Sequence, residues 1–190
     1  MQKKELNKRF LDKKQIETAR LTLRRIRPSD AADVYAYASL PCVVRYLSWN
    51  EHPDLLHTKR YLAYLDTRYR VGQFFDFAIV LRASNRMIGT IGFVSFDENN
   101  SAAEVGYVLH PDFWGQGIMT EALTAIIRFG FEELSLHRIE ASYMPENLAS
   151  RRVMEKCGMV FEGIRRGARL VKGAYIDIGT CAILLEDYAK

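Results

Sequence analysis

The segment Tyr107-Val-Leu-His-Pro-Asp-Phe-Trp-Gly-Gln-Gly-Ile-Met-Thr-Glu-Ala122 is the most informative part of this chain. Apolar side chains alternate over residues 105–109, which predicts a strand. Pro111, Gly115 and Gly117 follow, and a helical apolar pattern begins directly after them. A strand, a small-residue loop and a helix start present unpaired backbone N–H groups to an anion, and glycine lets the backbone approach a phosphate closely. The segment therefore predicts a phosphate-binding loop.

The length and composition indicate one globular domain. A chain of 190 residues can bury a full core but is short for two domains. Its 48% hydrophobic and 26% charged residues are ordinary for a soluble protein. The net charge of +4 suits an acidic ligand such as a phosphorylated cofactor, whereas nucleic-acid-binding proteins usually concentrate their charge more. We therefore expect no nucleic-acid partner.

The sequence shows no membrane or signal segment and no cysteine motif. The sequence contains no apolar run of membrane-spanning length, and its N-terminus is polar and lysine-rich, so neither a transmembrane helix nor a signal peptide is expected. Cys42, Cys157 and Cys181 show no CxxC or Cys/His spacing, which predicts neither a disulfide framework nor a metal site. We expect a cytoplasmic protein with reduced thiols, no metal and no membrane partner.

The pattern along the chain predicts a mixed α/β fold. Residues 1–15 have few apolar anchors and are expected to form a basic, flexible extension, followed by a single domain over residues 16–188. Helices are expected after Pro28, where Ser29 or Asp30 would cap, and over 54–70, after Gly117, and over 147–156. The expected strands cover residues 20–27, 75–81, 87–96, 103–109, 137–143, 160–164 and 175–185.

The connections between these elements predict the topology of the sheet. Turn signals at Asn85-Arg86 and Asn99-Asn100 indicate hairpins and hence a mostly antiparallel sheet. The strand, helix and strand over residues 103–143 imply one parallel crossover beside the glycine loop. Ligands favour such a change in connectivity, which strengthens the case for a site there.

Three fragments together resemble a known family. Ala103-Glu-Val-Gly-Tyr107, Trp114-Gly-Gln-Gly-Ile-Met-Thr-Glu-Ala122, and Asn147-Leu-Ala-Ser150 continuing to Met154-Glu-Lys-Cys-Gly-Met159 resemble the acetyl-CoA-binding region of the GNAT superfamily of N-acetyltransferases. They are most similar to the RimJ/RimL-like branch, whose named members acetylate N-terminal amines of ribosomal proteins. The resemblance covers roughly residues 17–187 and implies a GNAT-like acyl-CoA N-acyltransferase fold with helices on both faces of the sheet.

The resemblance also implies a cofactor site. The co-substrate would be acetyl-CoA, with its pyrophosphate held by backbone amides of residues 116–120. The strand at Val108 and Leu109 would pair with the pantetheine arm and polarise the acetyl carbonyl, and Asn147 would hold the arm from the other side. The expected cofactor-binding set comprises Val108, Leu109, Trp114, Gly115, Gln116, Gly117, Ile118, Met119, Thr120, Asn147 and Ser150.

The catalytic residues depart from the superfamily pattern. Trp114 and Met119 stand where the loop commonly has Gln or Arg and Gly or Ala, a variation that this branch tolerates. Met154 stands where many members have a tyrosine that protonates the leaving thiolate, and methionine cannot donate a proton. Ser150, earlier on the same helix, occupies the position of a serine that this branch uses, and is expected to hydrogen-bond the departing sulfur. Glu104, at the start of the central strand, is the candidate base or water-relay partner.

Several functions remain open from sequence. The leading hypothesis is acetyl transfer to a peptide or protein N-terminal α-amine, and small amines such as polyamines or antibiotic-like molecules are alternative acceptors. A non-catalytic acyl-CoA-binding protein is a second hypothesis, motivated by Met154. A general nucleotide-phosphate binder is a third, weakened because the loop has neither the P-loop lysine nor a complete GxGxxG pattern. A monomer and a homodimer are both compatible with the sequence.

Overall fold

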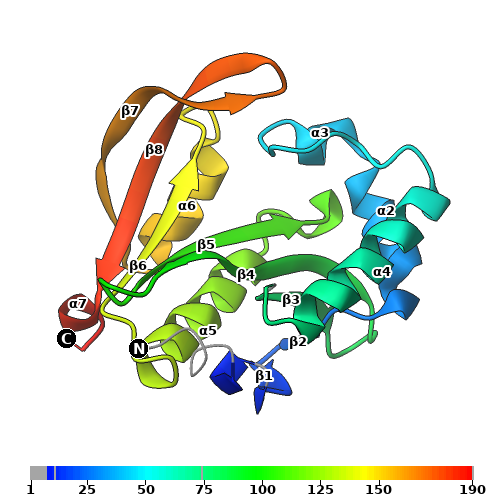
Figure 1. Cartoon of the computed structure of the whole chain (residues 1–190), viewed down its shortest axis with the longest axis horizontal. Coiled ribbons are helices and arrows are strands. Elements are labelled where there is room, and N and C mark those ends of the chain that lie inside the picture. Colours follow the sequence, from blue (N-terminus) through cyan, green and yellow to red (C-terminus); the bar gives the residue numbers. More distant parts are fainter. Residues whose placement is uncertain (1–7, 11, 74, 190) are drawn as a thin grey trace.

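The computed structural model describes residues 8–10, 12–73 and 75–189. One eight-stranded sheet runs through the molecule in the order β1-β2-β3-β4-β5-β6-β8-β7 (Figure 1). The strands are β1 (Gln15–Glu17), β2 (Leu21–Arg25), β3 (Asp76–Leu81), β4 (Met87–Asp97), β5 (Ala102–Leu109), β6 (Arg138–Tyr143), β7 (Val160–Val171) and β8 (Ala174–Leu184).

The helices are η1 (Pro28–Asp30), α2 (Ala31–Ala38), α3 (Pro41–Val44), α4 (Leu55–Arg70), η2 (Pro111–Phe113), α5 (Ile118–Glu132), α6 (Leu148–Lys156) and α7 (Leu185–Tyr188). The helices expected after Pro28, over residues 54–70, after Gly117 and over residues 147–156 are present, and three short helices, α3, η2 and α7, were not predicted. Leu62, Leu65 and Tyr69 form the buried stripe of α4, at the three- and four-residue steps of an amphipathic helix. Asp54 caps that helix by accepting a hydrogen bond from the backbone N–H of His57 at 2.6 Å. Within the described ranges, no helix has the length and apolar content needed to span a membrane.

The sheet has the predicted topology. The strand pairs are antiparallel except β5 with β6, which are parallel and connected through α5. The predicted α/β fold class, with a mostly antiparallel sheet and one parallel crossover, is therefore confirmed.

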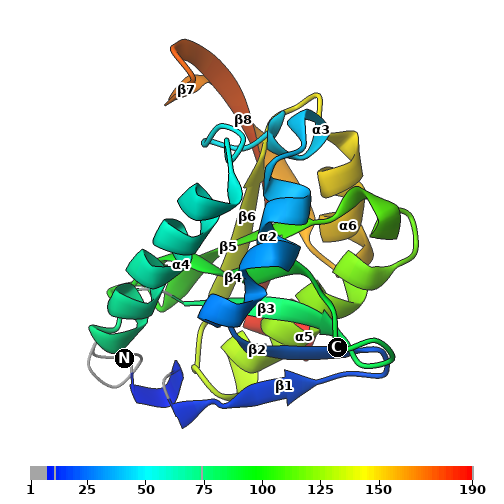
Figure 2. The ribbon, with the colours of Figure 1, turned by 90° about the vertical axis from the view of Figure 1, so that its right-hand side faces the viewer.

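The two faces of the sheet carry different helices (Figure 2). Phe77 of β3 and Phe93 of β4 both pack against Phe129 of α5, with ring centroids 6.0 and 6.4 Å apart. α6 lies beside α5 on this face, and α2 and α4 cover the opposite one. Side chains alternate between the faces along each strand, so neighbouring residues of one strand serve different helix layers.

The described part of the basic N-terminal segment packs onto the domain. The Phe10 ring is 4% exposed and lies 5.1 Å from that of Phe75 and 4.9 Å from that of Phe77. The guanidinium of Arg9 donates to the carbonyl of Glu133 at 2.8 Å. The remainder of the predicted flexible extension, residues 1–7 and 11, lies outside the described residues.

Two local expectations differ from the structure. Asp30 precedes α2, but its carboxylate pairs with Arg24 at 2.8 Å and accepts from the Arg27 backbone N–H at 2.7 Å instead of capping α2. β7 continues to Val171, seven residues beyond the predicted end at 164, because β7 and β8 form a long hairpin that closes at Lys172 and Gly173. Nearly all of β7 is exposed, so it lacks the alternation that would have predicted its full length.

Candidate active site

The parallel strands at the crossover separate before they end. β5 and β6 are in register from Ala102 with Arg138 to Val105 with Ala141. Beyond that point, residues 106–109 of β5 pair with β4, and within the described chain they have no strand partner on the β6 side. An unpaired strand edge carries free N–H and C=O groups that can bind an extended ligand. Val108 and Leu109, which were predicted to contact the cofactor, lie on this free edge.

The glycine loop follows directly from the same strand. Gly115 and Gly117 both adopt φ of 73°, a left-handed conformation that glycine accepts without strain. Gly117 is the N-cap of α5, and the N–H of Glu121 is the first to bond back into the helix, to the Gly117 carbonyl at 3.0 Å. No acceptor for the backbone N–H groups of residues 115–120 is present in the described part of the chain. A row of unsatisfied donors at the start of a long helix is suited to a diphosphate.

An ion pair supports this loop from the residue before β2. Arg20 donates to the carboxylate of Glu121 at 2.6 Å and to the backbone carbonyl of Gln116 at 3.0 Å. Thr18 donates to the same carboxylate at 2.6 Å. Burial alone would raise the pKa of Glu121, but the hydrogen bonds from Thr18 and Arg20 outweigh it and lower the pKa. Glu121 therefore stays ionised and fixes the Arg20 guanidinium under the loop, where its positive charge favours an anion.

The start of α6 brings Ser150 onto the central strand. The phenol oxygen of Tyr107, on β5, lies 2.9 Å from Ser150 Oγ and 3.1 Å from the Ser150 carbonyl oxygen. Burial raises the pKa of Tyr107 well above its ordinary value, although the hydrogen bond to Ser150 opposes this shift, so the phenol is a hydrogen-bond donor at neutral pH. Tyr107 was part of the motif but was not predicted as a site residue. Its alternation with buried Val105 and Ala103 indicated only a core position.

Asn147 precedes the first residue of α6, and Met154 lies in the last turn of the same helix. Asn147 is the N-cap of α6, and its side-chain oxygen accepts from the Ser150 N–H at 3.2 Å. The side-chain oxygen is thus engaged in capping, which leaves the amide NH₂ for any ligand. Met154 is 1% exposed and belongs to the core. Cys157 then ties α6 to α5, because its thiol donates to the Thr120 carbonyl at 3.5 Å.

Glu104 lies on the other side of the sheet from Ser150. It precedes Gly106 by two residues, and even-numbered side chains of β5 face α2 and α4, whereas Tyr107 faces α6. The Glu104 carboxylate is 19% exposed and lies 3.7 Å from the guanidinium of Arg169 on β7. The predicted base and the predicted acid therefore approach the β5 edge from opposite faces.

The remaining predicted residues near the glycine loop have mainly structural contacts. Trp114 is half exposed, and its indole N–H donates to the Leu109 carbonyl at 2.9 Å, which joins the loop to the end of β5. Ile118 and Met119 point into the core, so only their backbone faces the loop. His110 is buried and accepts from the Asp112 N–H at 3.2 Å, a structural role.

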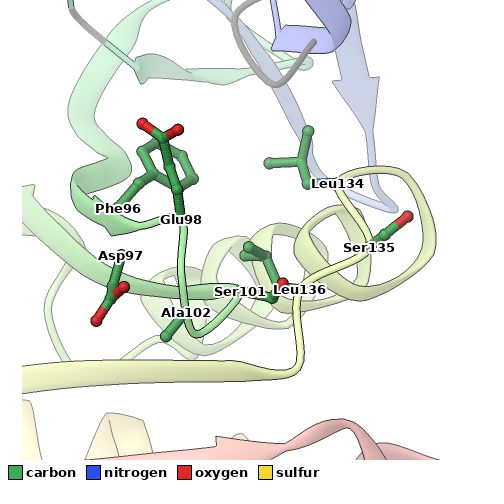
Figure 3. A pocket seen from close by; sticks show the side chains of 8 residues that line it. All are labelled: Phe96, Asp97, Glu98, Ser101, Ala102, Leu134, Ser135 and Leu136. Atoms are coloured by element: carbon green, nitrogen blue, oxygen red, sulfur yellow. The ribbon is translucent and has the colours of Figure 1, made fainter. Parts of the chain in front are cut away.

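A shallow pocket lies at the opposite end of β5 (Figure 3). It is formed by the turn over residues 96–102 and by residues 134–136 after α5. Residues 96–102 lead into β5, whereas the glycine loop follows its far end, so this pocket is not part of the candidate active site.

The splayed parallel strands, the glycine loop with its free N–H groups, and the Ser150–Tyr107 pair lie along one strand end and suit an acyltransferase that binds an extended, phosphorylated co-substrate. The family comparison agrees: residues 20–160 match the family described as "Acetyltransferase (GNAT) domain". The chain belongs to the GNAT family of acetyltransferases and is an N-acetyltransferase. Members of this family use acetyl-CoA.

Individual relatives support the same assignment. The chain is 34% identical to the "Uncharacterized N-acetyltransferase p20" of Bacillus licheniformis, over 90% of this chain and 97% of that protein. It is 28% identical to the "[Ribosomal protein uS5]-alanine N-acetyltransferase" of Escherichia coli, over 93% of each chain. A GNAT acetyltransferase from Bacillus anthracis superposes with a TM-score of 0.80 at 30% identity, over 90% of this chain and 99% of that one. The RimJ/RimL-like resemblance predicted from sequence is thus confirmed.

Proposed function

We propose that this protein transfers the acetyl group of acetyl-CoA to the N-terminal α-amine of a peptide or protein in the cytoplasm. The observation that carries the proposal is the row of unsatisfied N–H groups over residues 115–120 beside the free edge of β5. This arrangement fits a ligand that has both a diphosphate and an extended arm. The peptide acceptor is supported by the E. coli relative, which is named for acetylation of a ribosomal-protein alanine.

Each residue has a definite part in the proposed reaction. The co-substrate supplies an activated thioester carbonyl. Residues 115–120 hold its diphosphate, and backbone groups of Val108 and Leu109 align the arm and polarise the carbonyl. Glu104, directly or through a water molecule, takes the proton that the attacking amine loses. Ser150 donates its hydroxyl hydrogen bond to the sulfur that departs as thiolate, and Tyr107 holds the serine in place.

How much Glu104 must contribute as a base depends on the pKa of the acceptor amine. An α-amine with a pKa of about 8 costs about 1 kcal/mol to deprotonate at roughly pH 7.4, whereas an alkylamine with a pKa of about 10.4 costs about 4 kcal/mol. The Glu104 carboxylate is already in an ion pair with the guanidinium of Arg169, 3.7 Å away. An acceptor that needs little help from a base therefore suits this site, which favours a peptide N-terminus over a polyamine.

Ligand-dependent thermal stability tests the cofactor part of the proposal. A ligand at a hundred times its Kd adds about 2.7 kcal/mol to the stability of the protein, which raises the Tm of a domain of this size by about 5–10 °C. Acetyl-CoA and CoA should give this shift, and ATP and NAD should not. An equal shift with ATP, or none with CoA, would contradict the assignment of residues 115–120 to CoA.

Mass spectrometry tests the acceptor. Short peptides with free N-termini should gain one acetyl group in the presence of acetyl-CoA, and the same peptides with blocked N-termini should not. Polyamines and antibiotic-like amines serve as the comparison set. A higher kcat/KM for any of these than for every peptide would replace the peptide acceptor with a small-molecule acceptor.

A further inference from the structure

Asp76, the first residue of β3, is half-buried, and its carboxyl group has no counter-ion among the residues that the structure describes. Its carboxylate makes no hydrogen bond and no ion pair with any residue that the structure describes. Desolvation raises its pKa from 3.8 to about 7. A desolvated carboxylate without a partner is costly, and such a group in a natural protein calls for a functional explanation.

The position of Asp76 relates it to the active site. It pairs with Gly92 of β4, and Gly92 pairs with Gly106 of β5, so the three residues form one row across the sheet. Paired residues point to the same face, which is the face that carries Glu104. With strands ~4.8 Å apart, Asp76 lies about 10 Å from the free edge of β5. Both intervening positions are glycines, so no side chain of this row stands between Asp76 and that edge.

Gly92 makes room for the carboxylate. A Cβ at this position would lie 2.4 Å from Asp76 Oδ1, closer than any real contact allows. The Asp76 carboxylate therefore lies against Gly92, and the β3 backbone also requires a glycine there, because the same Cβ would be 2.2 Å from the Phe75 carbonyl oxygen and 2.4 Å from the Asp76 Cα. A larger residue at Gly92 would displace it.

Three tyrosines of the covering helices lie near enough to Asp76 to be influenced by its charge. The Asp76 charge adds to the effect of burial in raising the pKa values of Tyr37 of α2 and Tyr61 of α4, and Tyr69 of α4 donates a hydrogen bond to the Asp76 backbone carbonyl. Burial, followed by the Asp76 charge, raises the pKa of Tyr61 to about 12. The guanidinium of Arg25 lies 4.3 Å from the centre of the Tyr69 ring but is 3.6 Å from Asp66, its ion-pair partner. A carboxylate among tyrosine rings is suited to a cation, through charge pairing and cation–π attraction.

We propose that Asp76, with the more exposed Tyr61 beside it, binds a second positively charged group of the acceptor, about 10 Å from the amine that is acetylated. This inference rests on the proposed function and adds a substrate preference to it. The side chain of a lysine next to the acceptor N-terminus can span this distance. The site would therefore select peptides with a basic residue near the N-terminus.

Kinetics on a matched peptide pair test the preference. One peptide has lysine at its second position, and the other has norleucine, which keeps the aliphatic chain but lacks the charge. Wild-type protein should show at least a tenfold lower KM for the lysine peptide, and Asp76→Asn should abolish this difference while leaving the norleucine peptide unaffected. Equal KM values for the two peptides with wild-type protein, or equal effects of Asp76→Asn on both, would overturn the inference.

A binding measurement separates this inference from the proposed function. Calorimetric titration of the lysine peptide in the presence of CoA needs no turnover. Loss of binding in Asp76→Asn would support the cation site even if no peptide were acetylated, and unchanged binding would contradict the cation site even if peptides were acetylated. Asp66→Asn is the control, because it removes a carboxylate that is already paired with Arg70 at 2.7 Å.

The pH dependence of stability provides a second readout of the Asp76 carboxylate, which has no partner among the described residues. Because the pKa of Asp76 is raised from 3.8 to about 7, the folded protein binds its proton more tightly, and stability falls as pH rises between these values. Wild type and Asp76→Asn should therefore have similar Tm values near pH 4, and the variant should have the higher Tm above pH 7. A constant difference across this pH range would show that Asp76 is already paired or solvated and would overturn the inference.

Discussion

The hydroxyl of Ser150 has one proton, and Tyr107 determines where that proton can point. If the tyrosine donates to Ser150 Oγ, at 2.9 Å, the serine proton is free for a departing thiolate. If the tyrosine donates to the Ser150 carbonyl, at 3.1 Å, the serine proton is drawn back to the phenol. Burial keeps the phenol protonated, so both arrangements remain available without a change of charge. Tyr107 is thus a positioning residue, and Ser150 is the group proposed to touch the substrate.

Substitution of the two hydroxyls separates these roles. General acid catalysis contributes ~10²–10⁴-fold, and a thiolate is an easy leaving group, so Ser150→Ala should lower kcat by about 10²-fold. Tyr107→Phe should lower kcat by roughly 3–10-fold, and neither change should alter the KM for acetyl-CoA. Steady-state kinetics provide the measurement, and Ser29→Ala, at an exposed serine of η1, is the control. A silent Ser150→Ala would instead favour a protein that binds acyl-CoA without serine-assisted catalysis.

At the scale of elements, the glycine loop depends on backbone conformation more than on side chains. Gly117 adopts a left-handed φ, and a Cβ there would have only an ordinary contact, 3.6 Å from Arg20. Gly117→Ala should therefore cost about 1–2 kcal/mol of strain, or ~2–8 °C in Tm. It should also weaken acetyl-CoA binding at least tenfold, because the added methyl group stands where the diphosphate must approach.

Gly173→Ala is the matched control for this effect. Gly173, at the tip of the β7–β8 hairpin, also has a positive φ, and a Cβ there would meet no atom within 4 Å. Both variants should lose similar stability without ligand, but only Gly117→Ala should lose affinity for acetyl-CoA in a calorimetric titration. Equal acetyl-CoA affinities in the two variants would place the diphosphate elsewhere.

The same elements show which parts of the structure could be predicted from sequence. The strand before the loop and the helix after it have strong periodicities, and α5 begins at Ile118 as the glycine signal indicated. The extent of β7 could not be predicted, because its stability comes from pairing with β8 instead of an apolar face. Tyr107 and Asp76 were missed for a related reason. Their importance depends on contacts with Ser150 and Tyr61, which are 43 and 15 positions away in the chain and are brought close only by the tertiary fold.

For the whole molecule, contacts between distant segments hold the active-site framework together. The ammonium of Lys172, at the tip of the β7–β8 hairpin, donates to the Val44 carbonyl of α3 at 2.9 Å, which connects this hairpin at one edge of the sheet to the helical segment between α2 and α4 (Figure 1). On the other side, Phe10 joins the N-terminal segment to β3 and α5, since its ring also lies 6.3 Å from that of Phe129. The proposed phosphate-binding N–H groups lie at the start of α5. The packing of α5 therefore helps to fix the position of these groups.

The burial of Phe10 implies that the N-terminal segment contributes to stability, although its composition predicted a flexible extension. Phe→Ala substitutions in a core cost ~3–5 kcal/mol, and a site near the chain end can relax, so Phe10→Ala should cost about 3 kcal/mol and lower Tm by ~6–12 °C. Thermal denaturation measures the loss, with Leu56→Ala, at a 55% exposed position of α4, as the control that should change Tm by little. A Tm for Phe10→Ala equal to that of wild type would show that the segment detaches in solution. A lowered Tm with an unchanged acetyl-CoA shift would show that it supports the fold without shaping the cofactor site.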